Sequence, residues 1–258
     1  MTTATQSPAT PPQTATEAGT ETATEQGSMN RWLIIAEVLA FVALALGSRY
    51  VMSLYFWRFA GPVSLIFTLG ILTVYLRGRG IGWRDLGVRH LPGLKAKLLL
   101  IPQTILTGIV FFAAVAAVLY GGPAIGLDFI GQVPDTVGDR FGDLEGNIPL
   151  FLLWLVIVWT AAAFGEEMFF RGYLITRLDT AFADIRWGVV LALVLPAMLF
   201  GYGHYYYQGL SGVIVTGTIG LVLGIMFVLF RRNLWPVIMW HGIIDTLAFT
   251  AMFMNWDV

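Results

Sequence analysis

The chain has 258 residues, of which 57% are hydrophobic and 12% are charged, and its formal net charge is −1. A soluble domain normally carries about 25% charged residues, so this composition excludes an ordinary water-soluble globule and indicates an integral membrane protein. The small net charge gives no reason to expect a nucleic-acid partner, and the absence of cysteine excludes disulfides, thiolate catalysis and cysteine-based zinc sites.

The polar segment at residues 1–28 contains no Leu, Ile, Val or aromatic residue. It cannot bury enough apolar surface to offset its chain entropy, so we predict a disordered tail. The tail is too long and too acidic for the start of a signal peptide, so the apolar residues 32–47 are predicted to be a retained anchor. The rest of the chain divides into N-terminal transmembrane helices and loops at 29–147 and a transmembrane core at 148–258.

The long apolar runs predict an all-α, polytopic membrane helix bundle with about seven transmembrane helices. The runs do not alternate between polar and apolar residues, as the strands of a membrane barrel would. The predicted spans are residues 32–47, 59–76, 98–120, 148–164, 187–207, 210–230 and 234–253.

The loops differ in charge. Residues 77–97 carry six basic residues and one aspartate, whereas residues 121–147 carry five acidic residues and one arginine. Arg231 and Arg232 lie in the link before the last span. The positive-inside rule puts the two basic links in the cytoplasm, and with seven spans this predicts a cytoplasmic N-terminus in the cell membrane.

Ionisable residues at membrane depth cost about 2.5–3.5 kcal/mol at the centre of a helix, so they are usually paired or functional. The first group is Glu166, Glu167 and Arg171, within an otherwise apolar stretch. If the helix continues, Glu167 and Arg171 are i,i+4 neighbours that can pair, and Glu166 points elsewhere, about 100° round the helix. The alternative is that the helix ends here and solvent surrounds the charges.

Two further groups lie in later spans. His204 stands toward the end of the fifth span, where it can also be read as an interfacial histidine in a belt of tyrosines. His241 and Asp245 are i,i+4 on one face of the last span, where they can also be a structural pair. Glu37, in the first span, is interpreted as a structural residue that snorkels to the cytoplasmic surface.

Three polar groups on three helices favour one shared site over three separate accidents. His204 lies near the end of its span and His241 near the start of its own, so a shared site requires tilted or broken helices. Pro196, Gly201 and Gly203 offer such breaks.

The motifs EExxxR at residues 166–171, FxxxH at 200–204 and HxxxD at 241–245, in this order, resemble the CPBP family. These are the CAAX-protease and bacteriocin-processing membrane proteins, also called Abi proteins, and the resemblance covers residues 150–253. Members are intramembrane endopeptidases, and the best understood remove the last three residues of prenylated CAAX proteins. The resemblance thus implies a multi-pass endopeptidase with membrane-associated, possibly lipidated, peptide or protein substrates.

The resemblance also implies roles for single residues. Glu166 is similar to the general base that activates water, and His204 would share that water. His241 and Asp245 would polarise the scissile carbonyl and hold its oxyanion, which amide hydrolysis requires. Glu167 and Arg171 would support the site.

Position 245 leaves the mechanism open, because an ionised aspartate cannot donate a hydrogen bond to an oxyanion. Asp245 must then be protonated, orient His241, or bind a metal. His204, His241, Glu166 and Asp245 together would make an acceptable Zn²⁺ set, and a purely glutamate-driven mechanism is equally compatible. Two other functions remain as alternatives, a proton-coupled transporter and a non-enzymatic bacteriocin-immunity or scaffold protein.

Overall fold

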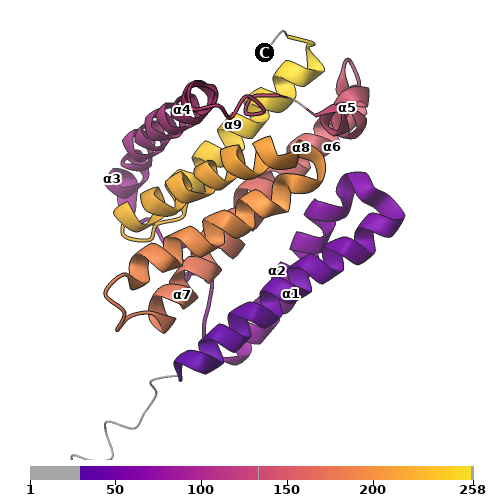
Figure 1. Cartoon of the computed structure of the whole chain (residues 1–258). Coiled ribbons are helices and arrows are strands. Elements are labelled where there is room, and N and C mark those ends of the chain that lie inside the picture. Colours follow the sequence, from indigo (N-terminus) through magenta and orange to yellow (C-terminus); the bar gives the residue numbers. More distant parts are fainter. Residues whose placement is uncertain (1–29, 133, 257–258) are drawn as a thin grey trace, which may run out of the picture.

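The computed structural model describes residues 30–132 and 134–256. The predicted disorder of residues 1–28 lies outside this range. Within the described residues all regular elements are helices (Figure 1), which confirms the all-α class. In chain order they are α1 (Arg31–Phe56), η1 (Trp57–Phe59), α2 (Ala60–Gly78), α3 (Gly93–Leu98), α4 (Leu100–Ala124), α5 (Asp135–Phe141), η2 (Gly142–Leu144), α6 (Ile148–Ile157), η3 (Val158–Ile175), α7 (Thr176–Ala181), α8 (Gly188–Leu229) and α9 (Trp235–Phe253).

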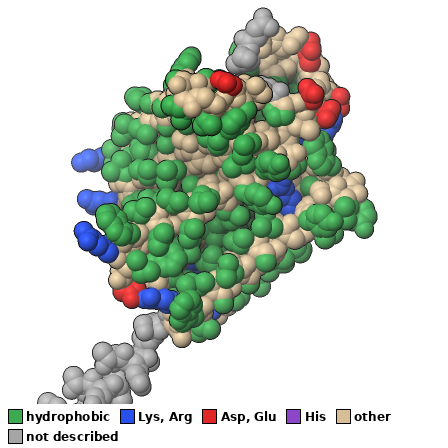
Figure 2. All heavy atoms as spheres, in the orientation of Figure 1, with side chains coloured by type: hydrophobic (Ala, Val, Ile, Leu, Met, Phe, Trp, Pro, Cys, Tyr) green, Lys and Arg blue, Asp and Glu red, His purple; other side chains and the backbone are tan. Residues whose placement is uncertain are grey.

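Five helical stretches are long and apolar enough to cross a membrane: Arg31–Gly78, Gly93–Ala124, Ile148–Ala181, Gly188–Leu229 and Trp235–Phe253. The number seven therefore stays a prediction. Two stretches, of 48 and 42 residues, are about twice as long as one crossing requires. Figure 2 shows a face covered by hydrophobic side chains, with basic side chains along one end and acidic ones at the other.

Helix α8 folds back on itself at Gly209, whose φ of 61° and ψ of −157° are not helical. This turn coincides with the predicted boundary between residues 207 and 210. The two halves lie against each other, because a Cβ on Gly201 would meet the backbone oxygen of Val213 at 2.4 Å. The breaks expected at Pro196, Gly201 and Gly203 are wrong: non-helical φ/ψ within α8 occurs at Gly209 alone. The helix stays regular at Gly201 because the missing side chain leaves room for the second half of α8.

We expect Gly201→Ala to destabilise the protein by about 1–3 kcal/mol, because the added methyl group overpacks two backbones that cannot separate freely. Thermal unfolding of the purified protein in detergent measures this effect. Gly70→Ala is the matched control, since no atom lies within 4 Å of a Cβ at Gly70 on α2. Equal melting temperatures for Gly201→Ala and the wild type would contradict the close packing.

A turn between α2 and α3 covers the start of α9. Gly87 has a positive φ of 106°, and its carbonyl oxygen accepts a 3.0 Å hydrogen bond from the backbone N–H of Leu234. A Cβ on Gly87 would lie 2.7 Å from the carbonyl oxygen of Arg232. Leu234 itself has no exposed surface. The last membrane helix therefore begins inside the protein.

Glu37 of α1 is buried in a polar cluster, so the prediction that it snorkels to the surface is wrong. Its two carboxylate oxygens accept hydrogen bonds from Arg177 Nε and Nη2 at 2.8 and 2.9 Å. The hydroxyl groups of Tyr75 and Tyr173 donate to the same carboxylate at 3.0 and 3.2 Å. A bidentate arginine satisfies a buried carboxylate well, so a structural role remains. The cluster joins α1 and α2 to η3 and α7.

Candidate active site

The helix that carries both adjacent glutamates runs without interruption from Ile148 to Ala181. The alternative in which the helix ends and solvent surrounds the charges is therefore wrong. Its middle part, η3, is a π-helix, a rare form that is frequent at functional sites. A turn closed by i→i+5 hydrogen bonds holds more than 3.6 residues, so Glu166 and Glu167 diverge by less than the 100° of an α-helix.

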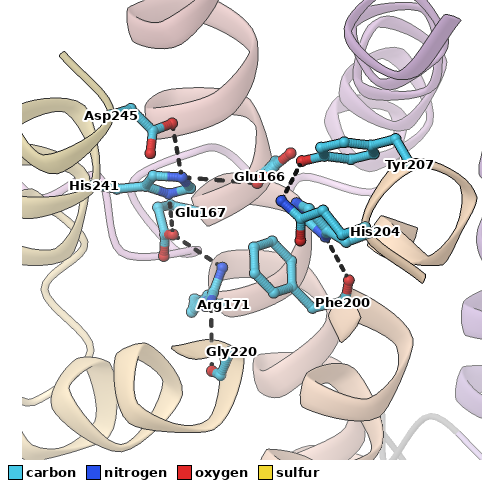
Figure 3. Close-up of polar contacts among 10 residues, drawn as sticks. Glu166, Glu167, Arg171, Phe200, His204, Tyr207, Gly220, His241 and Asp245 are labelled. Atoms are coloured by element: carbon cyan, nitrogen blue, oxygen red, sulfur yellow. Dashed lines mark hydrogen bonds and ion pairs between the residues drawn. The ribbon is translucent and has the colours of Figure 1, made fainter. Parts of the chain in front are cut away.

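Glu166 and Glu167 have different surroundings. The Glu166 side chain lines a cavity and keeps 23% of its surface exposed, whereas the Glu167 side chain is fully buried. Both glutamates nevertheless contact the imidazole of His241 (Figure 3), at 3.8 Å from Glu166 Oε2 to Nε2 and 2.8 Å from Glu167 Oε1 to Nδ1. The two glutamates thus reach one imidazole from different surroundings, and the role of Glu166 as a free base stays a prediction.

Arg171 and Glu167 form the predicted i,i+4 ion pair. Arg171 Nη1 lies 2.9 Å from Glu167 Oε1, and only 1% of the arginine side chain is exposed. Arg171 also donates to the carbonyl oxygen of Gly220 at 3.3 Å and lies over the ring of Phe200 at 4.6 Å. The pair thus ties η3 to both halves of α8. Neither residue lines the cavity.

His241 is held from both ring nitrogens. Its Nδ1 faces Glu167, and its Nε2 lies 3.4 Å from Asp245 Oδ2 as well as near Glu166. Only a protonated imidazole donates from both nitrogens at once. This arrangement fixes the ring and presents Nε2 toward the cavity that Asp245 and Glu166 also line.

His204 lies on the same cavity, on the first half of α8. Its Nδ1 donates to the carbonyl oxygen of Phe200 at 2.8 Å. Because a carbonyl oxygen only accepts, the proton lies on Nδ1, and Nε2 of the neutral ring is left as an acceptor. The ring packs between Phe200 and Tyr207, with centroids 4.8 and 5.8 Å away. Two of the tyrosines that follow His204, Tyr206 and Tyr207, line the same cavity, whereas Tyr205 is exposed.

The cavity has a volume of about 370 Å³ and is lined mainly by apolar and aromatic side chains, as ligand pockets usually are. It brings together Glu166, His204, His241 and Asp245 from three helices. They meet although their distances along the predicted spans differ, and α8 is unbroken between Gly188 and His204.

The cavity is also lined by polar residues that were not predicted as site residues, namely Arg49, Arg140, Tyr206, Tyr207 and Gln208. The first helix runs nine residues beyond its predicted end, to Phe56, so Arg49 is part of a helix rather than of a link. The acidic loop folds into α5 and η2. The single arginine in that loop was the available signal for Arg140.

The residues considered for zinc do not form a metal site as they stand. Within residues 30–132 and 134–256, no group of three or more His, Asp or Glu side chains is arranged to hold a metal ion. Because these side chains are not arranged as a metal site, no step of the reaction proposed for them uses a metal ion.

Comparison with known proteins gives one match. Residues 148–247 match the family model described as type II CAAX prenyl endopeptidase Rce1-like. No curated protein and no solved structure matches the chain. The matched segment contains all three motifs and lies within the predicted transmembrane core at 148–258, which confirms the resemblance to the CPBP family.

Proposed function

We propose that this membrane protein is an endopeptidase that hydrolyses peptide bonds within the bilayer by means of a glutamate-activated water. The observation that carries the proposal is the convergence of Glu166, His204, His241 and Asp245 on one cavity in an otherwise apolar bundle. Buried ionisable groups are retained in membrane helices chiefly for function. The Rce1-like match supports a peptidase over a transporter or an immunity protein.

In the proposed reaction Glu166 is the general base. Its carboxylate takes a proton from a water molecule, and the resulting hydroxide attacks the carbonyl carbon of the scissile bond. Nε2 of neutral His204 accepts the second hydrogen of that water as a hydrogen bond and so orients it. Glu166 then gives its proton to the leaving amine as the tetrahedral intermediate collapses.

The oxyanion of that intermediate needs a hydrogen-bond donor, and His241 supplies it from Nε2. The 2.8 Å contact between Nδ1 and Glu167 fixes the ring orientation, and Arg171 balances the charge of Glu167. Of the three roles left open for Asp245, the 3.4 Å contact with Nε2 supports orientation of His241. Glu167 and Arg171 are thus positioning residues.

We also propose a substrate class and a membrane location for the protein. The family description names prenyl endopeptidases, so we propose a lipidated peptide or protein whose chain enters the cavity from the bilayer. The charge of the loops supports a location in the cell membrane with a cytoplasmic N-terminus.

The proposal is tested with purified protein in detergent and a quenched fluorogenic peptide that ends in a farnesylated cysteine and three further residues. Wild type is expected to release the terminal tripeptide, identified by mass. His204→Ala should lower kcat/KM about 10- to 100-fold, because the attacking water loses one orienting partner. His90→Ala is the matched control, since that histidine is exposed in the loop before α3.

The same preparations separate this proposal from its rivals. Wild type that cleaves no peptide but takes up protons in liposomes would favour a transporter. Equal cleavage by His204→Ala and His90→Ala would exclude His204 from the site.

A further inference from the structure

Two arginines line the same cavity as the proposed catalytic residues. Arg49 comes from α1 and Arg140 from α5. Among the residues that the structure describes, neither arginine forms an ion pair with a carboxylate. By contrast, Arg171 pairs with Glu167 and Arg177 pairs with Glu37. The cavity therefore carries two arginines that are not in ion-pair contact with the carboxylates of Glu166 and Asp245.

Arg140 is the more buried of the two, with 6% of its surface exposed. Its guanidinium lies among four aromatic rings, with the centroids of Tyr207, Phe141, Tyr206 and Trp154 at 4.3, 5.0, 5.1 and 5.7 Å. Its Nε has no hydrogen-bond partner among the described residues. Aromatic faces attract a cation, but they satisfy no N–H group. A buried donor left unsatisfied in this way indicates a missing acceptor.

Arg49 lies beside Arg140. Its guanidinium stands 3.8 Å from the centroid of the Tyr206 ring, and one N–H group donates to the carbonyl oxygen of Gly203 at 2.7 Å. Both guanidinium groups are close to the Tyr206 ring, with Arg49 at 3.8 Å and Arg140 at 5.1 Å from its centroid. The distance between the two groups is therefore at most the sum of these two distances. The two cations therefore lie around one aromatic ring of the cavity.

The two arginines are next to the chemistry. Gly203, the acceptor for Arg49, directly precedes His204. The Tyr207 ring contacts both the Arg140 guanidinium, at 4.3 Å, and the His204 ring, at 5.8 Å. An anion at the arginines is therefore one aromatic ring away from His204.

We propose that Arg49 and Arg140 bind the C-terminal carboxylate of the peptide substrate and so direct cleavage to a bond near the chain end. This inference rests on the proposed endopeptidase function. The planar guanidinium fork matches a carboxylate, and the surrounding aromatic walls strengthen the attraction by excluding water. An extended tripeptide spans about 10 Å, which sets the distance from the carboxylate to the bond that is cleaved.

The test uses two quenched farnesylated peptides that differ only at the end, one a free acid and the other an amide. Wild type should cleave the acid with a kcat/KM about 10- to 100-fold higher, mostly through KM, because a charge-assisted hydrogen bond is worth that factor. Arg140→Gln and Arg49→Gln should lose most of this preference, because their kcat/KM for the acid falls toward their own value for the amide. Arg186→Gln, an exposed arginine stacked on Trp187, is the control and should keep the preference.

The amide peptide reports whether a variant is folded, and the half-buried Arg49 gives the same readout if Arg140→Gln does not accumulate. Equal cleavage of acid and amide by wild type would overturn the inference but leave the endopeptidase function intact. Cleavage of neither would overturn both. The same assay is repeated with phosphatidylglycerol vesicles added. If the vesicles inhibit wild type but not the variants, and the variants keep the acid preference, the arginines bind a lipid phosphate and the carboxylate proposal is wrong.

Discussion

Replacing Glu166 by glutamine is expected to lower kcat/KM for the farnesylated peptide by about 10²–10⁴-fold, the usual contribution of a general base. The amide has the shape of the carboxylate but cannot take a proton from water. Because Glu166 lines the cavity and keeps 23% of its side chain exposed, the substitution strands no buried charge. KM and the melting temperature should therefore change little.

The control for this substitution is Glu145→Gln, the same chemical change at an exposed loop position before α6. It should cleave the peptide at the wild-type rate. If Glu166→Gln retained wild-type turnover, the general base would have to be sought elsewhere on the cavity, with Asp245 the first candidate, and the proposed chemistry would be wrong.

The helical class and the turn at Gly209 could be predicted from the sequence because long apolar runs and a glycine between them leave few other structures in lipid. The ends of the helices could not. Hydropathy marks where a chain leaves the apolar layer. Helix α1 extends past that point to Phe56, and the helix predicted to end at residue 164 continues through Glu166 to Ala181. Once Glu167 is paired with Arg171, the interior of the protein replaces solvent around the charges.

The candidate catalytic residues could be predicted because ionisable groups are rare in apolar spans, so each of them stands out. Arg49 and Arg140 could not, since both lie outside the predicted spans and only the tertiary fold turns them toward the cavity. The partner of Glu37 was missed for the same reason. Arg177 lies beyond the predicted end of the fourth span, and the continued helix brings it back to α1.

Arg171→Met should destabilise the protein by about 3–5 kcal/mol, the typical cost of removing one partner from a buried ion pair. Glu167 has no exposed surface, and its Oε2 already lacks a hydrogen-bond partner among the described residues. Without Arg171 its charge is balanced by His241 alone. A lower melting temperature in detergent measures the loss. Arg58→Met is the control: its partner Asp143 is 67% exposed, so we expect a change below about 1 kcal/mol.

A double variant separates the stability of this pair from its part in catalysis. Glu167→Met combined with Arg171→Met leaves no buried charge behind, and apolar side chains of similar volume often replace such a pair at little cost. We therefore expect the double variant to melt well above Arg171→Met alone. It should still cleave the peptide poorly, because Nδ1 of His241 has lost the carboxylate that fixes its ring. Recovery of both stability and turnover would show that Glu167 does not position His241, whereas a double variant as unstable as the single one would show that the ion pair itself holds η3 against α8.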